Sequence, residues 1–121
     1  MCVPMGRLTT HVLDMAHGRP AAGMTVELAE IDGDSRHVVT RETTNAQGRC
    51  DQPLLDGDDF RTGVWELSFH VAKYYSARDV PLTDPPFLDV VTIRFGVADA
   101  EQHYHVPLLV TPWSHSTYRG S

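Results

Sequence analysis

The segment HYHVPLLV, residues 103–110, contains two histidines one residue apart at the start of an otherwise apolar run. Successive side chains of a β-strand point to opposite faces, so His103 and His105 are expected to share one face. The core face is then predicted to carry Tyr104, Val106, Leu108 and Val110. Imidazole titrates near neutral pH and can exchange protons or bind a metal ion, so the histidine face is a candidate for chemistry.

Three further features could join this pair of histidines. His11, in LTTHVLD, lies opposite Leu8 and Val12 on its expected strand, and the first and late strands of a small sandwich can lie side by side. Arg49 follows a turn glycine in NAQGR, and a planar guanidinium donates two parallel hydrogen bonds to a urea-like or carboxylate-like group. The chain ends in the polar segment STYRGS.

A metal site is an alternative interpretation of the same histidines. Two histidines separated by one residue on a strand point the same way, and His11 or His115 could supply the third ligand that zinc needs. The sequence has no paired-cysteine motif and no His-Glu-x-x-His motif, so we predict that no metal is bound. Cys2 and Cys50 are expected to be free thiols, and no pattern supports Cys50 as a nucleophile.

Short alternating segments separated by turn residues predict an all-β fold that positions these groups. Seven or eight strands in one small domain are typical of a sandwich or barrel. The clearest strand is VWELSFHV, residues 64–71, with Trp65, Leu67 and Phe69 expected inside and Glu66, Ser68 and His70 outside. One or two helical turns are expected in AKYYSARD, residues 72–79, and a final edge strand after Pro112.

Length and charge limit the remaining possibilities. The 121 residues are enough for one domain with a real core but not for two. The formal net charge of −6 argues against nucleic acid or an anionic membrane as a partner. The segment MCVPMGRLTT does not resemble a secretory signal, and no apolar run approaches the length of a membrane span, so the cytoplasm is the expected location.

Taken together, LTTHVLD, the GR after NAQ, HYHVPLL and the terminal STYRGS resemble the transthyretin-related 5-hydroxyisourate hydrolases in order and spacing, over essentially the whole chain. The resemblance implies one transthyretin-like hydrolase domain over residues 1–121. Its expected fold is an all-β sandwich of two four-stranded antiparallel sheets with one short helix in VAKYYSA, after the strand of Trp65. It also implies a homotetramer, a dimer of dimers, whose active sites lie where the dimers meet.

The resemblance implies hydrolysis of 5-hydroxyisourate, the product of urate oxidation, by water attack on a ring carbonyl without a cofactor. The residues it assigns to catalysis are His11, Arg49, His105 and Ser121. Those it assigns to binding the small-molecule substrate are His103, Tyr118, Arg119 and Gly120. The sequence leaves open which histidine is the general base, and His115 stands where an aromatic residue is expected.

Two other classes of function are compatible with the same fold. One is a non-catalytic carrier that binds small aromatic ligands in a channel between dimers, which would have no need of His11, Arg49, His105 or the YRGS tail. The other is a structural sandwich that mediates protein contacts, because a fold alone does not determine chemistry.

Overall fold

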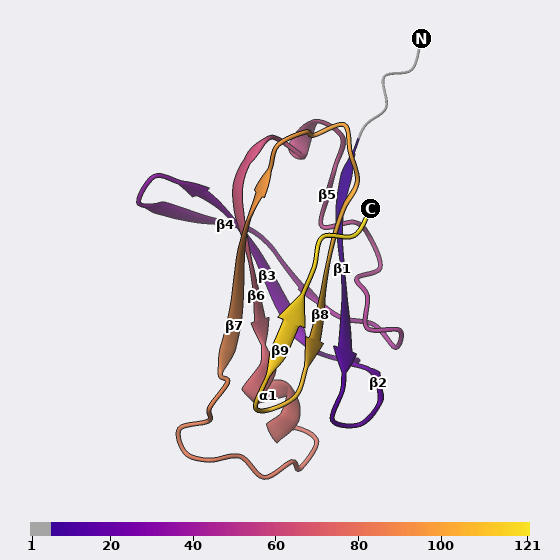
Figure 1. The fold of residues 1–121 in the computed structure, drawn as a ribbon, viewed down its shortest axis with the longest axis vertical. Coiled ribbons are helices and arrows are strands. Elements are labelled where there is room, and N and C mark those ends of the chain that lie inside the picture. The colour runs from indigo at the N-terminus through magenta and orange to yellow at the C-terminus, as the bar shows by residue number, and fades with distance from the viewer. Residues whose placement is uncertain (1–5) are drawn as a thin grey trace.

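Two β-sheets pack against each other in the computed structural model, which describes residues 6–121 (Figure 1). Cys2, expected to be a free thiol, lies outside the described residues. One sheet has the order β2-β1-β8-β9, with β5 also paired to β1; its strands are β1 (Arg7–Asp14), β2 (Arg19–Pro20), β5 (Leu55–Asp56), β8 (Tyr104–Val110) and β9 (His115–Thr117). The other has the order β4-β3-β6-β7; its strands are β3 (Thr25–Asp32), β4 (Ser35–Thr43), β6 (Gly63–His70) and β7 (Val90–Val97).

The predicted fold class is confirmed, with two differences in detail. The expected short helix is α1 (Val71–Ser76), directly after β6, and a 3₁₀ turn covers Gly57–Asp59. The first sheet has five strands rather than four, because the two-residue strands β2 and β5 both pair with β1. It is also not wholly antiparallel, since β1 and β8 run parallel. A parallel pair needs a long connection, and here the chain passes through the whole second sheet between these strands.

The core forms between the sheets from the alternating apolar residues of each strand. All four residues predicted for the core face of residues 103–110 are buried: Tyr104, Val106, Leu108 and Val110. Trp65, Leu67 and Phe69 of β6 are buried as well, as predicted. The helix α1 adds the buried Tyr74 and Tyr75 at one end of this core. No helix within residues 6–121 is long and apolar enough to cross a membrane.

The expected exposure of Glu66 and Ser68 on β6 is wrong. Both side chains lie on the opposite face from Trp65, but they are only 7% and 4% exposed. Arg94 from the adjacent β7 and Arg36 from β4, which lies beyond β3, cover them, with Nε atoms 2.7 and 3.2 Å from the two carboxylate oxygens of Glu66. Strand alternation assigns a side chain to a face, but long arginine side chains from other strands of the sheet decide whether that face reaches water.

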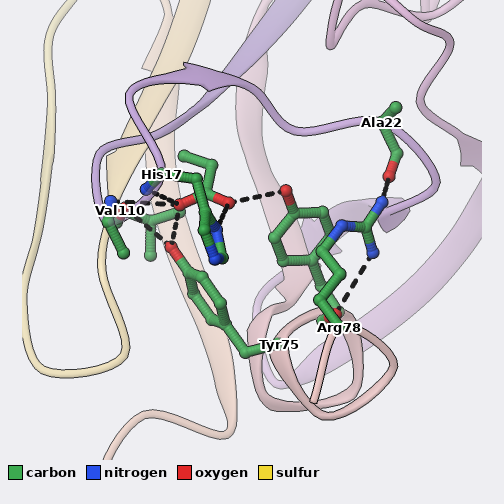
Figure 2. Close-up of polar contacts among 8 residues, drawn as sticks. His17, Ala22, Tyr75, Arg78 and Val110 are labelled. Carbon is green, nitrogen blue, oxygen red and sulfur yellow. Dashed lines mark hydrogen bonds and ion pairs between the residues drawn. The ribbon is translucent and has the colours of Figure 1, made fainter. Parts of the chain in front are cut away.

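The buried carboxylate of Asp14, at the end of β1, connects the two sheets through α1. It accepts hydrogen bonds from the hydroxyls of Tyr74 and Tyr75, both at 2.8 Å, and from Nδ1 of His17 at 2.6 Å. Figure 2 shows His17 and Tyr75 converging on this group, with Arg78 reaching across to Ala22. Burial alone would raise the pKa of Asp14, but these hydrogen bonds outweigh it and lower the pKa.

Replacing Asp14 by Asn is expected to lower the free energy of unfolding at neutral pH by about 3 kcal/mol, because buried hydroxyl donors lose a charged acceptor. A folded-state pKa below the unfolded value means that the carboxylate stabilises the fold above its unfolded pKa and that this contribution disappears as pH falls through the folded pKa. Urea denaturation at several pH values measures both effects. Asp34→Asn, on the exposed β3–β4 turn, is the control and should change stability by less than about 0.5 kcal/mol. Equal stability of the Asp14→Asn and Asp34→Asn proteins would contradict this account.

Candidate active site

The parallel pairing of β1 with β8 brings His11 and His105 together on the outer face of the first sheet. Thr9 pairs with His105 and His11 with Pro107, so His11 and His105 occupy neighbouring positions on one face. Their ring centroids are 6.5 Å apart. The rings do not stack at this separation, and a small group placed between them would contact both.

The turn at residues 45–48 places Arg49 against the same strand. Gly48 has φ +76°, and a Cβ atom there would lie 2.4 Å from the carbonyl oxygen of Val12. Only glycine permits this approach, in which the carbonyl of Gly48 accepts a hydrogen bond from the Val12 N–H at 2.8 Å. Arg49 consequently forms a β-bridge with His11.

The end of the chain is held against β8 by backbone hydrogen bonds. Gly120 and His105 exchange two of them, at 3.1 and 2.7 Å. A Cβ atom on Gly120 would lie 3.2 Å from Cβ of His105, so the glycine allows the tail to lie close to the imidazole. The terminal residue Ser121 then lies beside the histidine face.

These elements enclose a cleft of about 460 Å³. Four of the predicted site residues line it: Arg49, His103, His105 and Ser121. His11 lies next to the cleft, through its contacts with His105 and Arg49, rather than in its lining. Six other lining residues were not predicted from the sequence: Arg7, Thr9, Thr10, Asp51, Gln52 and Pro53. Cys50, considered above only as a nucleophile, lines the cleft as well.

Arg119 and Tyr118 are not part of this cleft. The pairing of Leu108 with Thr117 continues to the bridge between His105 and Gly120, so Arg119 falls on the core face of the sheet. Its guanidinium carbon lies 4.3 Å from the centre of the Tyr104 ring, and Nη2 donates to the His103 carbonyl at 3.1 Å. Tyr118 is 60% exposed, and both residues border a second, apolar cavity of about 270 Å³ next to β7.

Each imidazole uses one ring nitrogen in a hydrogen bond. Nε2 of His11 lies 2.8 Å from the carbonyl oxygen of Gln47, and Nδ1 of His105 lies 2.9 Å from Oγ1 of Thr9. Thr9 precedes His11 by two residues, so strand alternation in the sequence already indicates that Thr9 lies on the face of the histidines. Gln47 acts through its backbone, which the sequence cannot indicate.

The local electrostatics favour the neutral form of both histidines. Burial and then the charge of Arg49 lower the pKa of His11, and its bond to Gln47 opposes them only in part. Burial, Arg49 and His11, in that order, lower the pKa of His105. Within residues 6–121, all hydrogen bonds of Arg49 are made by its backbone, so its guanidinium is available to a ligand. The site therefore combines neutral bases with an uncommitted cation.

Neither a cysteine nucleophile nor a metal site, the two alternative chemistries, is supported by this geometry. Burial, with Glu42 and Asp51 nearby, raises the pKa of the Cys50 thiol to about 11, so the thiolate nucleophile is scarce at neutral pH. His115 begins β9 opposite Val110, at the other end of β8 from His105. Within the described part of the chain, no three His, Cys, Asp or Glu side chains are grouped as a metal ion would require.

Comparisons with known proteins agree on one family. A model of the HIUase/Transthyretin family matches residues 8–120. The protein named 5-hydroxyisourate hydrolase in Pseudomonas aeruginosa is 57% identical over 118 residues, which cover 98% of this chain and 94% of that protein. The structure of Klebsiella pneumoniae 5-hydroxyisourate hydrolase superposes with a TM-score of 0.80 at 30% identity, covering 97% of this chain and all of that one. Sea bream transthyretin in complex with thyroxine gives a TM-score of 0.84 at 23% identity, with 94% of each chain covered, which shows a shared fold.

Proposed function

Since the chain belongs to the HIUase/Transthyretin family, we propose that it hydrolyses 5-hydroxyisourate to 2-oxo-4-hydroxy-4-carboxy-5-ureidoimidazoline in urate breakdown. The identity to named hydrolases extends over nearly the whole chain. The observation that carries the proposal is the cleft itself, where the neutral His105, the uncommitted guanidinium of Arg49 and the chain end at Ser121 converge. A carrier needs none of these groups.

In the reaction we propose, His105 is the general base, because it lines the cleft whereas His11 lies beside it. If Nδ1 of His105 donates its proton to Oγ1 of Thr9, the lone pair of Nε2 is free to take a proton from water. The water oxygen bonds to the ring carbonyl carbon, and the carbonyl electrons move to oxygen. When the carbonyl re-forms, the ring C–N bond breaks and the leaving nitrogen takes the proton back from His105.

The other groups have electrostatic and binding roles in this proposal. Arg49 stabilises the negative charge that develops on the carbonyl oxygen, because its fork of N–H donors is already in the cleft. His11 helps to orient the water from beside His105. Ser121 and His103 hold the flat, polar ring through hydrogen bonds, and Gly120 serves binding by letting the tail lie close to His105, so that Ser121 reaches the cleft.

Tyr118 and Arg119 were assigned to substrate binding by resemblance, and this role stays a prediction. The register of the tail puts Tyr118 opposite Pro107, and in our proposal its side chain contacts the substrate from there, outside the lining of the cleft. Arg119 has a second role in our proposal: its contacts with Tyr104 and the His103 carbonyl fix the tail that delivers Ser121.

The proposed assembly is a homotetramer, a dimer of dimers, that covers the histidine face. Leu13 and Leu109, which pair on this face, are only half-buried in one chain. Covering these apolar groups with a second copy would also exclude water from the cleft. Native mass spectrometry tests the proposal: a mass of four chains is expected, and a fully active monomer would contradict it. The cytoplasmic location is part of the same proposal and is tested by cell fractionation.

The activity itself is tested by generating 5-hydroxyisourate in situ from urate and following its decay by absorbance. The protein is expected to accelerate the decay in proportion to its concentration. Binding of aromatic ligands without acceleration would favour a carrier instead. A protein that neither binds nor accelerates would favour a structural role.

The pH profile of kcat/KM follows from the lowered pKa values of the two histidines. The base acts in its neutral form, and the pKa values of both His11 and His105 lie below the ordinary 6.5. The acid limb of kcat/KM is therefore expected to have its midpoint below 6.5, with activity nearly constant at the alkaline end of the range, at about pH 8. Initial rates between about pH 5 and 8, corrected for uncatalysed decay, measure this limb. A limb centred above 6.5 would show that another group, or a more exposed histidine, is titrating.

A further inference from the structure

The segment Asn45–Arg49 is held in shape by hydrogen bonds that converge on the side chain of Asn45. Its Oδ1 accepts from the backbone N–H groups of Gln47 at 2.9 Å and Arg49 at 3.1 Å. Its Nδ2 donates to Oδ1 of Asp51 at 3.0 Å. The N–H of Asn45 also donates to the Arg49 carbonyl at 2.7 Å, so the segment closes on itself. One amide therefore fixes the backbone on both sides of Gly48.

One part of this segment lines the active-site cleft, and another contacts His11 beside it. The side chain of Arg49 lines it, and the carbonyl of Gln47 lies 2.8 Å from Nε2 of His11. A peptide carbonyl can only accept a hydrogen bond, so Nε2 of His11 carries the proton. In the neutral ring the lone pair is then on Nδ1, and the direction of the Gln47 carbonyl determines this tautomer.

We propose that Asn45 is a positioning residue for the hydrolysis, which sets the direction of Arg49 and the tautomer of His11 without touching the substrate. A free loop would let the Gln47 carbonyl rotate away and allow His11 to exchange between tautomers. The same freedom would move the guanidinium of Arg49 away from the developing charge. The kinetic part of this inference rests on the proposed hydrolase function, whereas the tautomer is a property of the protein alone.

The first test is the Asn45→Ala variant, which removes the acceptor and the donor together. A small displacement of an aligned charge can reduce a rate by about 100-fold, so kcat is expected to fall roughly 10- to 100-fold with little change in KM. Nitrogen NMR of the imidazoles should show a single Nε2–H tautomer for His11 in the unmodified protein and a mixture in the variant. The pKa of His105 should rise toward 6.5, because Arg49 no longer stays beside it.

A matched double variant exchanges the side chains of residues 45 and 51, which keeps the hydrogen bonds of this segment and the net charge. In Asn45→Asp/Asp51→Asn, a carboxylate accepts the N–H groups of Gln47 and Arg49, and the amide lies on the other side. Because Asp51 lines the cleft, the reference for this variant is Asp51→Asn alone. The exchange is expected to keep the single tautomer and a kcat within about 3-fold of that reference, as order rather than side-chain identity is required.

These outcomes separate positioning from simple stabilisation of the loop. The inference is overturned if Asn45→Ala loses activity while the His11 tautomer and the His105 titration stay unchanged, or if all three stay unchanged. Should Asn45→Ala fail to fold, the exchanged variant Asn45→Asp/Asp51→Asn decides. A mixture of His11 tautomers in it overturns the inference, and a single tautomer with a kcat near that of Asp51→Asn supports the inference. If the unmodified protein hydrolyses nothing, the proposed function fails, but the NMR readouts still decide the role of Asn45.

Discussion

Replacing His105 by Asn is expected to lower kcat by about 10²–10⁴-fold, the usual contribution of a positioned general base. The amide cannot take a proton from water at neutral pH. The fold should survive, because within residues 6–121 the imidazole makes one side-chain hydrogen bond, to Thr9, and the bonds that hold the tail to β8 are made by the backbone of His105. Steady-state rates on 5-hydroxyisourate, together with native mass spectrometry, measure activity and assembly on the same sample.

The control for this variant is His37→Asn, because His37 is exposed on β4 in the other sheet. That protein should hydrolyse the substrate at the unmodified rate. A His105→Asn protein with full activity would remove His105 from the base role and leave His11 as the candidate. A His105→Asn protein that does not fold would instead show that the imidazole is needed for the structure.

Strand alternation predicts which residues share a face with the histidines, but it does not predict which strands lie side by side. The two-residue period of residues 103–110 correctly separated His105 from Tyr104 and the other buried residues. It could not say that β1 would pair with β8, because strands that are neighbours in a sheet need not be neighbours in the sequence. The parallel pairing that puts His11 beside His105 required the three-dimensional structure.

The sequence was least informative where the backbone performs the function. Gly48 is recognisable as a turn residue, but nothing in the sequence shows that the turn packs on Val12 and thereby delivers Arg49 to the cleft. The carbonyl of Gln47 would be available with any side chain at that position. The resemblance assigns Arg119 to substrate binding, which stays a prediction, and the register of the tail puts this residue on the core face, a position that the sequence alone did not indicate.

The second large effect is expected from replacing Arg49 by Met, which keeps an unbranched but shorter apolar side chain and removes the guanidinium with its charge. The guanidinium is the cation we assign to the developing oxyanion, and loss of one such donor costs about 10²–10³-fold in kcat, or roughly 3–4 kcal/mol. The variant should also change the pH profile. Arg49 lowers the pKa of both His11 and His105, so without it the acid limb of kcat/KM is expected to move upward, toward 6.5.

Arg49→Lys separates the two effects of this residue. Lysine keeps the positive charge, so the acid limb should remain near its original position, but its single ammonium lacks the planar fork that holds a carbonyl oxygen and a neighbouring group together. Its kcat should therefore fall while the pH profile is preserved. A fully active Arg49→Met protein, or an acid limb that moves to lower pH, would contradict the assignment. The first result would mean that the cation in the cleft does not stabilise the transition state, and the second that it does not lower the pKa values of the two imidazoles.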